Sequence, residues 1–154
     1  SRKMRLAPEK RAGLSVAALV HDIGKITIPA EILAKPNLLS PSEMLLIQTH
    51  PKVGFEILKK IDFPWPVAEI VYQHHEACDG SGYPQRLFGD QILLEAKILS
   101  VADMIEATSS DRPYRPAMGI DHALEQLLKL RGAKYDPAIV DACVEAFEKG
   151  FSWG

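Results

Sequence analysis

The stretch Val20-His21-Asp22-Ile23-Gly24-Lys25 is the most informative part of this sequence. It places an imidazole and a carboxylate side by side, with an ammonium group three residues beyond the carboxylate. Four of the five histidines fall in the first half of the chain, and two of them, His74 and His75, are adjacent. Structural histidines rarely occur as an adjacent pair beside an acid-rich loop. We therefore interpret these histidines as metal ligands and expect the fold to bring them together.

The length and charge of the chain are those of one ordinary globular domain. A chain of 154 residues can bury one real core but is too short for two comfortable domains. A net charge of −2 provides neither a basic surface for a nucleic-acid polymer nor a polybasic membrane patch. No apolar run approaches the roughly 18–20 residues that a membrane span requires. An anionic substrate would therefore have to be bound by local cations and metal.

The cysteines and the first residues bear on location and on completeness. Cys78 and Cys143 are far apart and belong to no ligand motif, so we expect reduced thiols in the cytoplasm. The basic start Ser1-Arg2-Lys3-Met4 has no apolar segment behind it and is not a signal peptide. The internal Met4 and the missing start methionine suggest a fragment of a longer protein. We expect residues 1–154 to form a single domain.

Apolar residues recur at helical spacing, and no run alternates as a strand would. The strongest start signal is Ser40-Pro41-Ser42-Glu43, a capping box with proline at the first helical position. Pro51 should kink the helix or restart it. Residues 26–29 should form a short extended link that ends at Pro29. The predicted helices cover residues 7–22, 40–50, 53–61, 67–75 and 94–108, with a turn at 30–34 and two terminal helices opening at 121 and 136. We predict an all-α domain with loops over 76–90 and 112–116.

The residue types in this set favour a metal site. Consecutive helical residues point about 100° apart, so His21 and Asp22 can both reach a pocket at a helix edge. A carboxylate can bridge two cations with its two oxygens, which makes Asp22 the natural bridging ligand. An unpaired Asp103 in an apolar helix would be costly to bury. Nitrogen and oxygen donors suit iron, manganese or zinc, and the absence of thiolates argues against a structural zinc site. The expected ligands are His21, Asp22, His50, His74, His75 and Asp103.

Each feature also has an ordinary structural interpretation when it is taken alone. A single histidine at a helix end is usually capped or exposed. Lys25 is compatible with a plain surface residue, and the glycines of residues 79–84 with simple turns. Arg112 and Arg115 are compatible with solvated charges, although the flanking prolines favour a rigid loop that could hold two phosphate-binding groups. Metal ligation is favoured by the set, not by any one member.

These motifs, taken in order, resemble the HD-GYP subgroup of HD-domain metal-dependent phosphohydrolases. The resemblance covers roughly residues 14 to 140, and its most specific part is the Gly-Tyr-Pro loop that follows the double histidine. The matching stretches are His21-Asp22-Ile23-Gly24-Lys25, Lys35-Pro36, His50-Pro51, His74-His75-Glu76, Asp79-Gly80-Ser81-Gly82-Tyr83-Pro84, Asp103 and Arg112-Pro113-Tyr114-Arg115.

The resemblance implies a helical bundle with phosphodiesterase activity on cyclic di-GMP, giving pGpG and, in some members, GMP. It implies a bacterial cytoplasmic signalling protein in which this domain follows a sensor or receiver domain. It also assigns the six metal ligands named above, a contact from Lys25 to the scissile phosphate, and a nucleotide site lined by Gly82, Tyr83, Pro84, Arg112 and Arg115. The family usually has a further ligand on an upstream helix, and this chain begins too late to contain it.

The expected chemistry is metal-assisted hydrolysis of a phosphodiester. Two divalent cations, most simply iron or manganese, would be bridged by Asp22 and would make hydroxide from a shared water. Lys25 would offset charge on the phosphate oxygens. The missing upstream ligand favours a rival interpretation, a non-catalytic module that binds a cyclic dinucleotide or a partner. A third interpretation keeps the enzyme but changes the substrate to another cyclic dinucleotide or to a nucleotide monophosphate.

Overall fold

The computed structural model describes residues 6–110 and 118–151. Arg112 and Arg115 therefore lie outside the described residues. Regular structure within these ranges is helical, apart from isolated β-bridges that join Asp79 to Phe88 and Arg131 to Tyr135. The elements are α1 (Pro8–Val20), η1 (Ile23–Thr27), α2 (Ala30–Leu33), α3 (Pro41–Ile47), α4 (His50–Leu58), α5 (Val67–Gln73), η2 (Gly89–Gln91), α6 (Leu94–Ser109), α7 (Ile120–Lys129) and α8 (Pro137–Glu148), where η marks a 3-10 helix. The all-α prediction is confirmed.

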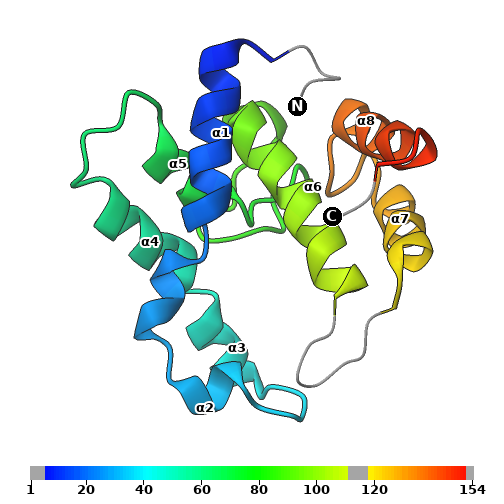
Figure 1. Cartoon of the computed structure of the whole chain (residues 1–154). Coiled ribbons are helices and arrows are strands. Elements are labelled where there is room, and N and C mark those ends of the chain that lie inside the picture. Colours follow the sequence, from blue (N-terminus) through cyan, green and yellow to red (C-terminus); the bar gives the residue numbers. More distant parts are fainter. Residues whose placement is uncertain (1–5, 111–117, 152–154) are drawn as a thin grey trace.

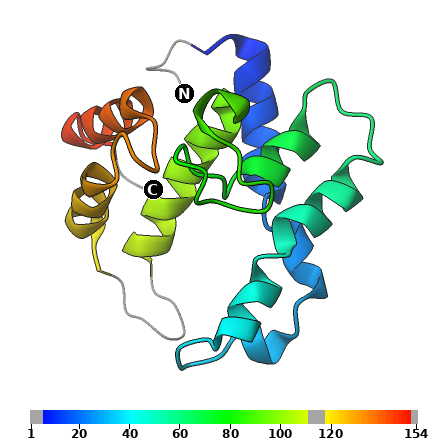
Figure 2. The same ribbon diagram turned by 180° about the vertical axis from the view of Figure 1, so that it is seen from behind.

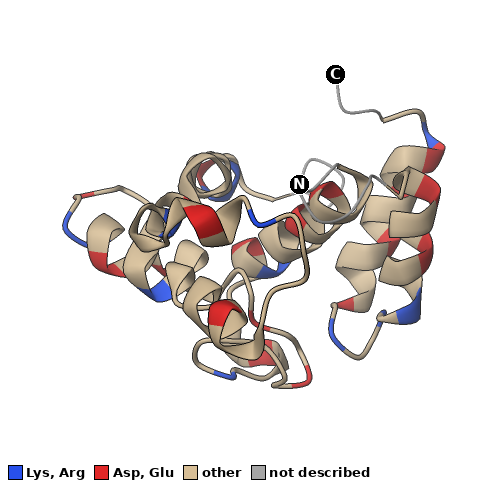
Figure 3. Ribbon diagram, turned by 90° about the horizontal axis from the view of Figure 1, so that it is seen from below, with Lys and Arg blue, Asp and Glu red and all other residues tan. Residues whose placement is uncertain are grey.

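Helix α6 is the centre of the arrangement (Figures 1 and 2). α1 and α5 pack on one side of it and α4 packs beside α5, while α7 and α8 pack on the other side. α2 and α3 project at one end of the molecule, and neither helix contains a buried residue. Acidic and basic positions are interspersed along the ribbon (Figure 3), in agreement with the small net charge.

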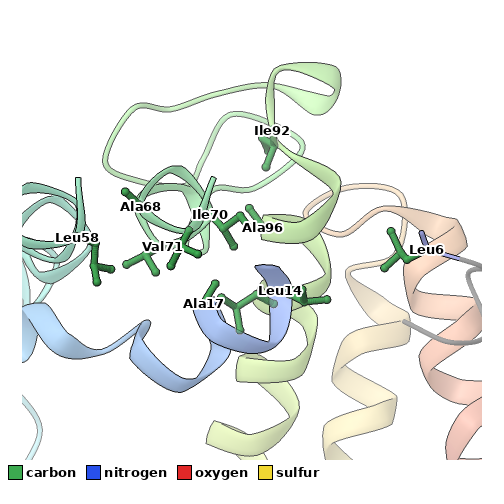
Figure 4. Close-up of a cluster of buried hydrophobic side chains, with 11 residues drawn as sticks. Leu6, Leu14, Ala17, Leu58, Ala68, Ile70, Val71, Ile92 and Ala96 are labelled. Atoms are coloured by element: carbon green, nitrogen blue, oxygen red, sulfur yellow. The ribbon is translucent and has the colours of Figure 1, made fainter. Parts of the chain in front are cut away.

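Two apolar cores flank α6. The first joins α1, α4, α5 and the start of α6, where Ala17, Ile70 and Ala96 are each 0% exposed and converge (Figure 4). The second joins α6 to the terminal helices through Val101, Ile105, Leu127 and Val140, among others. Burial of apolar surface stabilises the folded state by about 25 cal/mol per Å². The two cores therefore hold α6 in place and fix the position of the polar residues that it carries.

The predicted start signals operate largely as expected. The hydroxyl of Ser40 accepts from the Glu43 amide (3.3 Å), and the Glu43 carboxylate accepts from the Ser40 amide (2.7 Å). Pro51 lies in the first turn of α4, so the chain restarts there as a separate helix. Asp136 caps α8 by accepting from the Ala138 amide (2.9 Å). Helix α7 differs slightly: its cap is Gly119, and Asp121 lies in the first turn.

The extended link predicted for residues 26–29 is wrong over its first half. The chain continues after Asp22 as the 3-10 helix η1, held by the bond from the Lys25 amide to the Asp22 carbonyl (2.9 Å). The second half of the link is extended as predicted, at Ile28 (φ −93°, ψ 130°) and at Pro29 (φ −54°, ψ 135°). The prediction failed because the side chains gave no sign of the tertiary contact that η1 makes with α4.

That contact depends on Gly24. A Cβ built at this position would lie 2.0 Å from the carbonyl oxygen of His50 and 2.7 Å from the amide nitrogen of Gly54. Both obstacles are backbone atoms, which cannot turn aside as a side chain can. The absence of a side chain at Gly24 therefore lets η1 lie directly on α4, and this brings His21 and Asp22 next to His50.

No helix within the described ranges has both the length and the apolar character needed to cross a membrane.

Replacing Gly24 with alanine should lower the free energy of unfolding by about 2 kcal/mol or more, because the new methyl group overlaps backbone. The matched control is Gly54→Ala on the facing helix. There the Cβ meets a methyl group of Val71 at 3.1 Å, a side chain that can give way. Alanine is also more favourable than glycine inside an α-helix by about 1 kcal/mol, which offsets the cost of this contact in Gly54→Ala. Urea unfolding of both variants tests this, and equal losses would contradict the proposed backbone contact.

Candidate metal centre

The six predicted ligands come together from four α-helices. His21 directly follows α1, His50 begins α4, His74 and His75 directly follow α5, and Asp103 lies in the middle of α6, while Asp22 precedes η1. Two groups of side chains could each hold a metal ion, with all ligand atoms of a group within 4.8 Å of one another. The first consists of His50, His74 and His75, and the second of His21, Asp22 and His74. The groups share His74, so the two positions are adjacent.

Three of the imidazoles are oriented in the same way, each by the end of the helix that precedes it. Each Nδ1 lies within hydrogen-bond distance of the main-chain carbonyl three residues earlier. The pairs are His21 with Ala18 (2.8 Å), His50 with Ile47 (2.7 Å) and His74 with Val71 (2.6 Å). A carbonyl oxygen only accepts, so each Nδ1 must carry the hydrogen. In the neutral ring Nε2 then carries no hydrogen, and its electron pair is free to bind a metal in the cluster. This is the usual arrangement of a metal-binding histidine.

His50 and His74 show that the cluster fits a cation. Their Nε2 atoms lie 3.4 Å apart, and the residues are 1% and 0% exposed. Because both Nδ1 atoms donate elsewhere, the two Nε2 electron pairs face each other with no hydrogen between them. Burial lowers the pKa of both imidazoles, so taking up a proton is an unfavourable way to relieve the repulsion between the two electron pairs. A cation bound to both nitrogens would remove the repulsion.

Asp22 belongs to the second group and also reaches His50 of the first. Its Oδ1 is 3.5 Å from Nε2 of His50, and its Oδ2 is 3.7 Å from Nε2 of His21. The two oxygens of one carboxylate thus face different imidazoles, as the prediction of a bridging ligand requires. Lys25 is also at the cluster, because its Nζ donates to Oδ2 of Asp22 at 2.7 Å.

Asp103 closes the cluster from the side of α6. Its Oδ1 lies 3.6 Å from Nε2 of His21, and its Oδ2 lies 4.0 Å from Nε2 of His75. Burial alone would raise the pKa of this carboxyl, but His21 and the other imidazoles outweigh it and lower the pKa to about 2. Asp103 in turn raises the pKa of His21. The carboxylate that looked costly in the sequence is only partly buried, with 21% of its side chain exposed, and His21 lies beside it.

The Gly-Tyr-Pro loop lies beside the cluster. The ring of Tyr83 stacks on the ring of His75, with centroids 5.0 Å apart and planes 21° apart. The Tyr83 amide donates to the His75 carbonyl at 3.1 Å. A Cβ at Gly82 would lie 2.3 Å from the amide nitrogen of Ala77, so this glycine permits the loop to fold back on itself. Pro84 follows Tyr83 through a cis peptide bond.

One buried acid next to the cluster received no role from the sequence. Glu76 is 4% exposed, and its carboxylate accepts hydrogen bonds from the amides of Gln85 and Leu87. The signal that could have drawn attention to it was its place directly after the double histidine. His122, which was also left without a role, lies on α7, where its Nδ1 is 4.0 Å from the carboxylate of Glu125.

A helical domain that gathers four imidazoles and two carboxylates around two adjacent cation positions is of the kind that phosphohydrolases use. The chain matches the HD domain family over residues 1–139 and belongs to that family. This confirms the family resemblance noted in the sequence, that of the HD-GYP subgroup of HD-domain phosphohydrolases.

Several characterised proteins are similar to this chain. The cyclic di-GMP phosphodiesterase response regulator RpfG of Xanthomonas campestris is 43% identical over 142 residues, 91% of this chain and 38% of that protein. A cyclic di-GMP phosphodiesterase of Thermotoga maritima is 40% identical over 131 residues, 84% of this chain and 36% of that protein. The 3′3′-cGAMP-specific phosphodiesterase 3 of Vibrio cholerae is 36% identical over 152 residues, 99% of this chain and 32% of that protein. The chain thus spans about a third of the length of these relatives.

Solved structures agree on the fold. Bd1817, an HDGYP protein from Bdellovibrio bacteriovorus, superposes with a TM-score of 0.77 at 22% identity, over 96% of this chain and 47% of that one. The cyclic GMP-AMP specific phosphodiesterase V-cGAP3 of V. cholerae superposes with a TM-score of 0.71 at 19% identity, over 97% of this chain and 41% of that one. The predicted HD-domain-like bundle is therefore confirmed.

Metal-free protein should become less stable as the pH falls from 6.5 towards 4. Burial lowers the pKa of His75 to about 4 in the folded protein, against 6.5 for an ordinary histidine. Between these values the unfolded chain binds a proton that the folded chain does not, so acid favours unfolding. The expected loss is on the order of 1–3 kcal/mol. Urea unfolding with a chelator, at several pH values, measures it.

Two variants control this measurement. His75→Gln should show a shallower dependence of the unfolding free energy on pH over this window. His122→Gln, outside the cluster, should keep the dependence of the parent. Identical curves for the parent and the His75 variant would contradict the assignment.

Proposed function

We propose that this chain is a single catalytic domain of a metal-dependent phosphodiesterase that hydrolyses cyclic di-GMP to pGpG and, in a further step, GMP. The observation that carries the proposal is the pair of adjacent cation positions sharing His74, next to the Gly-Tyr-Pro loop. The names of the relatives similar to most of this chain support the substrate.

The cluster would hold two divalent cations, for which iron and manganese are the preferred candidates. All the donors are imidazole nitrogens or carboxylate oxygens, which both metals accept. His21 would bind one cation and Asp22 would bridge both, with His50, His74, His75 and Asp103 completing the set. When bound, the cations would supply Lewis acidity and bring the pKa of a water towards neutrality.

The remaining roles fall to side chains around the cluster. Lys25, now bonded to Asp22, would turn its ammonium group to a non-bridging oxygen of the scissile phosphate and offset the developing charge. Tyr83, with Gly82 and Pro84, would form one wall of the nucleotide site. One face of the Tyr83 ring lies on His75, so the base would meet the other face or the edge. Arg112 and Arg115 would bind the second phosphate or a guanine edge.

Two other functions are the alternatives to this proposal. Relatives named 3′3′-cGAMP-specific phosphodiesterases are 36% and 34% identical to this chain, which favours that dinucleotide as an alternative substrate. A non-catalytic module that binds a cyclic dinucleotide or a partner is the second alternative. It would apply if hydrolysis requires the further ligand that the family usually supplies from an upstream helix.

We also propose that the domain acts in the bacterial cytoplasm under the control of a sensor or receiver domain. RpfG, which is named a response regulator, supports such a partner. Cys78 and Cys143 are both free thiols, which suits a reducing compartment.

A direct assay separates these functions. The chain is incubated anaerobically with Mn²⁺ or Fe²⁺ and equimolar cyclic di-GMP and 3′3′-cGAMP, and the products are separated by chromatography. We expect pGpG to appear first and to require the metal. Preferential loss of 3′3′-cGAMP would move the proposal to that substrate, and binding of dinucleotide without any product would support the non-catalytic module.

Replacing Asp22 with alanine should lower the rate of cyclic di-GMP hydrolysis at least about 100-fold, because the bridging carboxylate is lost. The bound metal, measured by elemental analysis after anaerobic purification, should fall as well. Asp62→Ala, at an exposed position after α4, is the matched control and should keep both. An Asp22 variant with full activity and full metal content would rule out this mechanism.

A further inference from the structure

We infer that Glu76 is a positioning residue that holds the Tyr83 loop against the cluster and thereby determines how well the site accepts a dinucleotide. The inference rests on the proposed function and extends it to a residue with no assigned role. Glu76 lies outside both groups of potential metal-binding side chains, and both of its carboxylate oxygens accept from backbone amides, so its part in the site is indirect.

Both carboxylate oxygens of Glu76 accept hydrogen bonds from the backbone of the loop. Its Oε1 accepts from the amide of Gln85 at 2.6 Å, and its Oε2 accepts from the amide of Leu87 at 2.9 Å. These bonds span nine and eleven residues of chain. A carboxylate that is 4% exposed is costly unless it is hydrogen-bonded, and charge-assisted bonds are among the stronger ones. The side chain thus closes residues 76–87 into a ring.

The other contacts of the loop connect this closure to Tyr83. The Tyr83 amide is bonded to the carbonyl of His75, the residue directly before Glu76. Gly82 is pressed against the backbone of Glu76, with the position of its missing Cβ 2.5 Å from the Cα. Tyr83 is therefore held on one side by His75 and on the other by a chain segment that Glu76 fixes at Gln85. Releasing that segment would loosen the stacking of Tyr83 on His75.

The surroundings leave Glu76 little freedom to move. It lines a cavity of only about 10 Å³ together with Cys78, Lys97 and Asp136. The side chain of Lys97 is 12% exposed, and its Nζ lies 3.6 Å from Oδ2 of Asp136. The carboxylate is thus enclosed between the loop, α6 and the cap of α8, with the partly buried side chain of Lys97 lining the same cavity.

Glu95 provides a matched control for a purely structural role. It is also 4% exposed, and its carboxylate lies 3.3 Å from Nζ of Lys10. It lines a different cavity, of about 220 Å³, together with Gly13 and Trp65. Replacing either glutamate disturbs a buried charge, but only Glu76 is bonded to the Tyr83 loop.

The test compares two substrates in the variant Glu76→Gln. Glutamine keeps the size of glutamate but replaces one of the two accepting oxygens with an NH₂ donor, so one of the two amides loses its acceptor in this position. The substrates are cyclic di-GMP and bis(p-nitrophenyl) phosphate, a small phosphodiester that needs the metal cluster but has no base to lie beside Tyr83. We expect kcat/KM for cyclic di-GMP to fall about tenfold, mainly through KM, and that for the small ester to change less than about threefold. Bound Mn²⁺ should be unchanged.

The ratio of the two kcat/KM values decides the inference. Glu95→Gln should keep the ratio of the parent, even if its melting temperature falls. An unchanged ratio in Glu76→Gln, or a parallel loss on both substrates, would overturn the positioning role. If Glu76→Gln does not fold, Glu76→Asp replaces it. Aspartate keeps both acceptors on a shorter stem, so it should displace the loop and lower the ratio, and an unchanged ratio would again overturn the role.

Amide hydrogen exchange distinguishes this inference from the proposed function. The Tyr83 amide does not bond to Glu76, yet its exchange should be at least about tenfold faster in Glu76→Gln than in the parent. A parent that cleaves the small ester but no cyclic dinucleotide would reject the proposed function, and faster Tyr83 exchange would still support the positioning role. Unchanged exchange at Tyr83 would reject the positioning role whatever the substrate proves to be.

Discussion

The repulsion between two buried nitrogen electron pairs, on His50 and His74, is the constraint around which this structure is built. The hydrogen bonds that orient these rings to the ends of the preceding helices also leave Nε2 without a hydrogen in each neutral ring. Their separation of 3.4 Å is unfavourable in an apolar interior unless a cation joins them. The two cores that flank α6 provide the stability that holds the helices carrying these rings in place.

The rest of the fold can be understood as the means of bringing two helix ends together. α4 begins with one of the two histidines, and α5 ends just before the other. The contact of Gly24 with the backbone of α4 adds His21 and Asp22 from a third direction, and α6 adds Asp103. Because each ligand is fixed by a helix terminus or by a packed helix, the donors are preorganised and little rearrangement is needed for a cation to bind.

Around the cluster lies a second layer that shapes what can approach it. Tyr83 covers one side of His75, and the loop that carries Tyr83 is tied down by Glu76 at a distance from the proposed chemistry. Lys25 is held by Asp22 and, in the proposed function, would turn to a substrate phosphate. In this arrangement the proposed hydrolysis depends on the inner donors, whereas the fit of a dinucleotide depends on a loop whose position is set by backbone hydrogen bonds.

The sequence by itself determined the helical class, the starts at Ser40 and Asp136, the restart at Pro51 and the identity of the candidate ligands. These features depend on residue type and on neighbours within a few positions, where capping and proline geometry act. Only the tertiary structure decided that residues 23–27 form a 3-10 helix, that Tyr83 stacks on a histidine, and that Glu76 holds the loop. Each of these results from contacts between groups that come close only when the helices pack, and local propensity carries no record of such contacts.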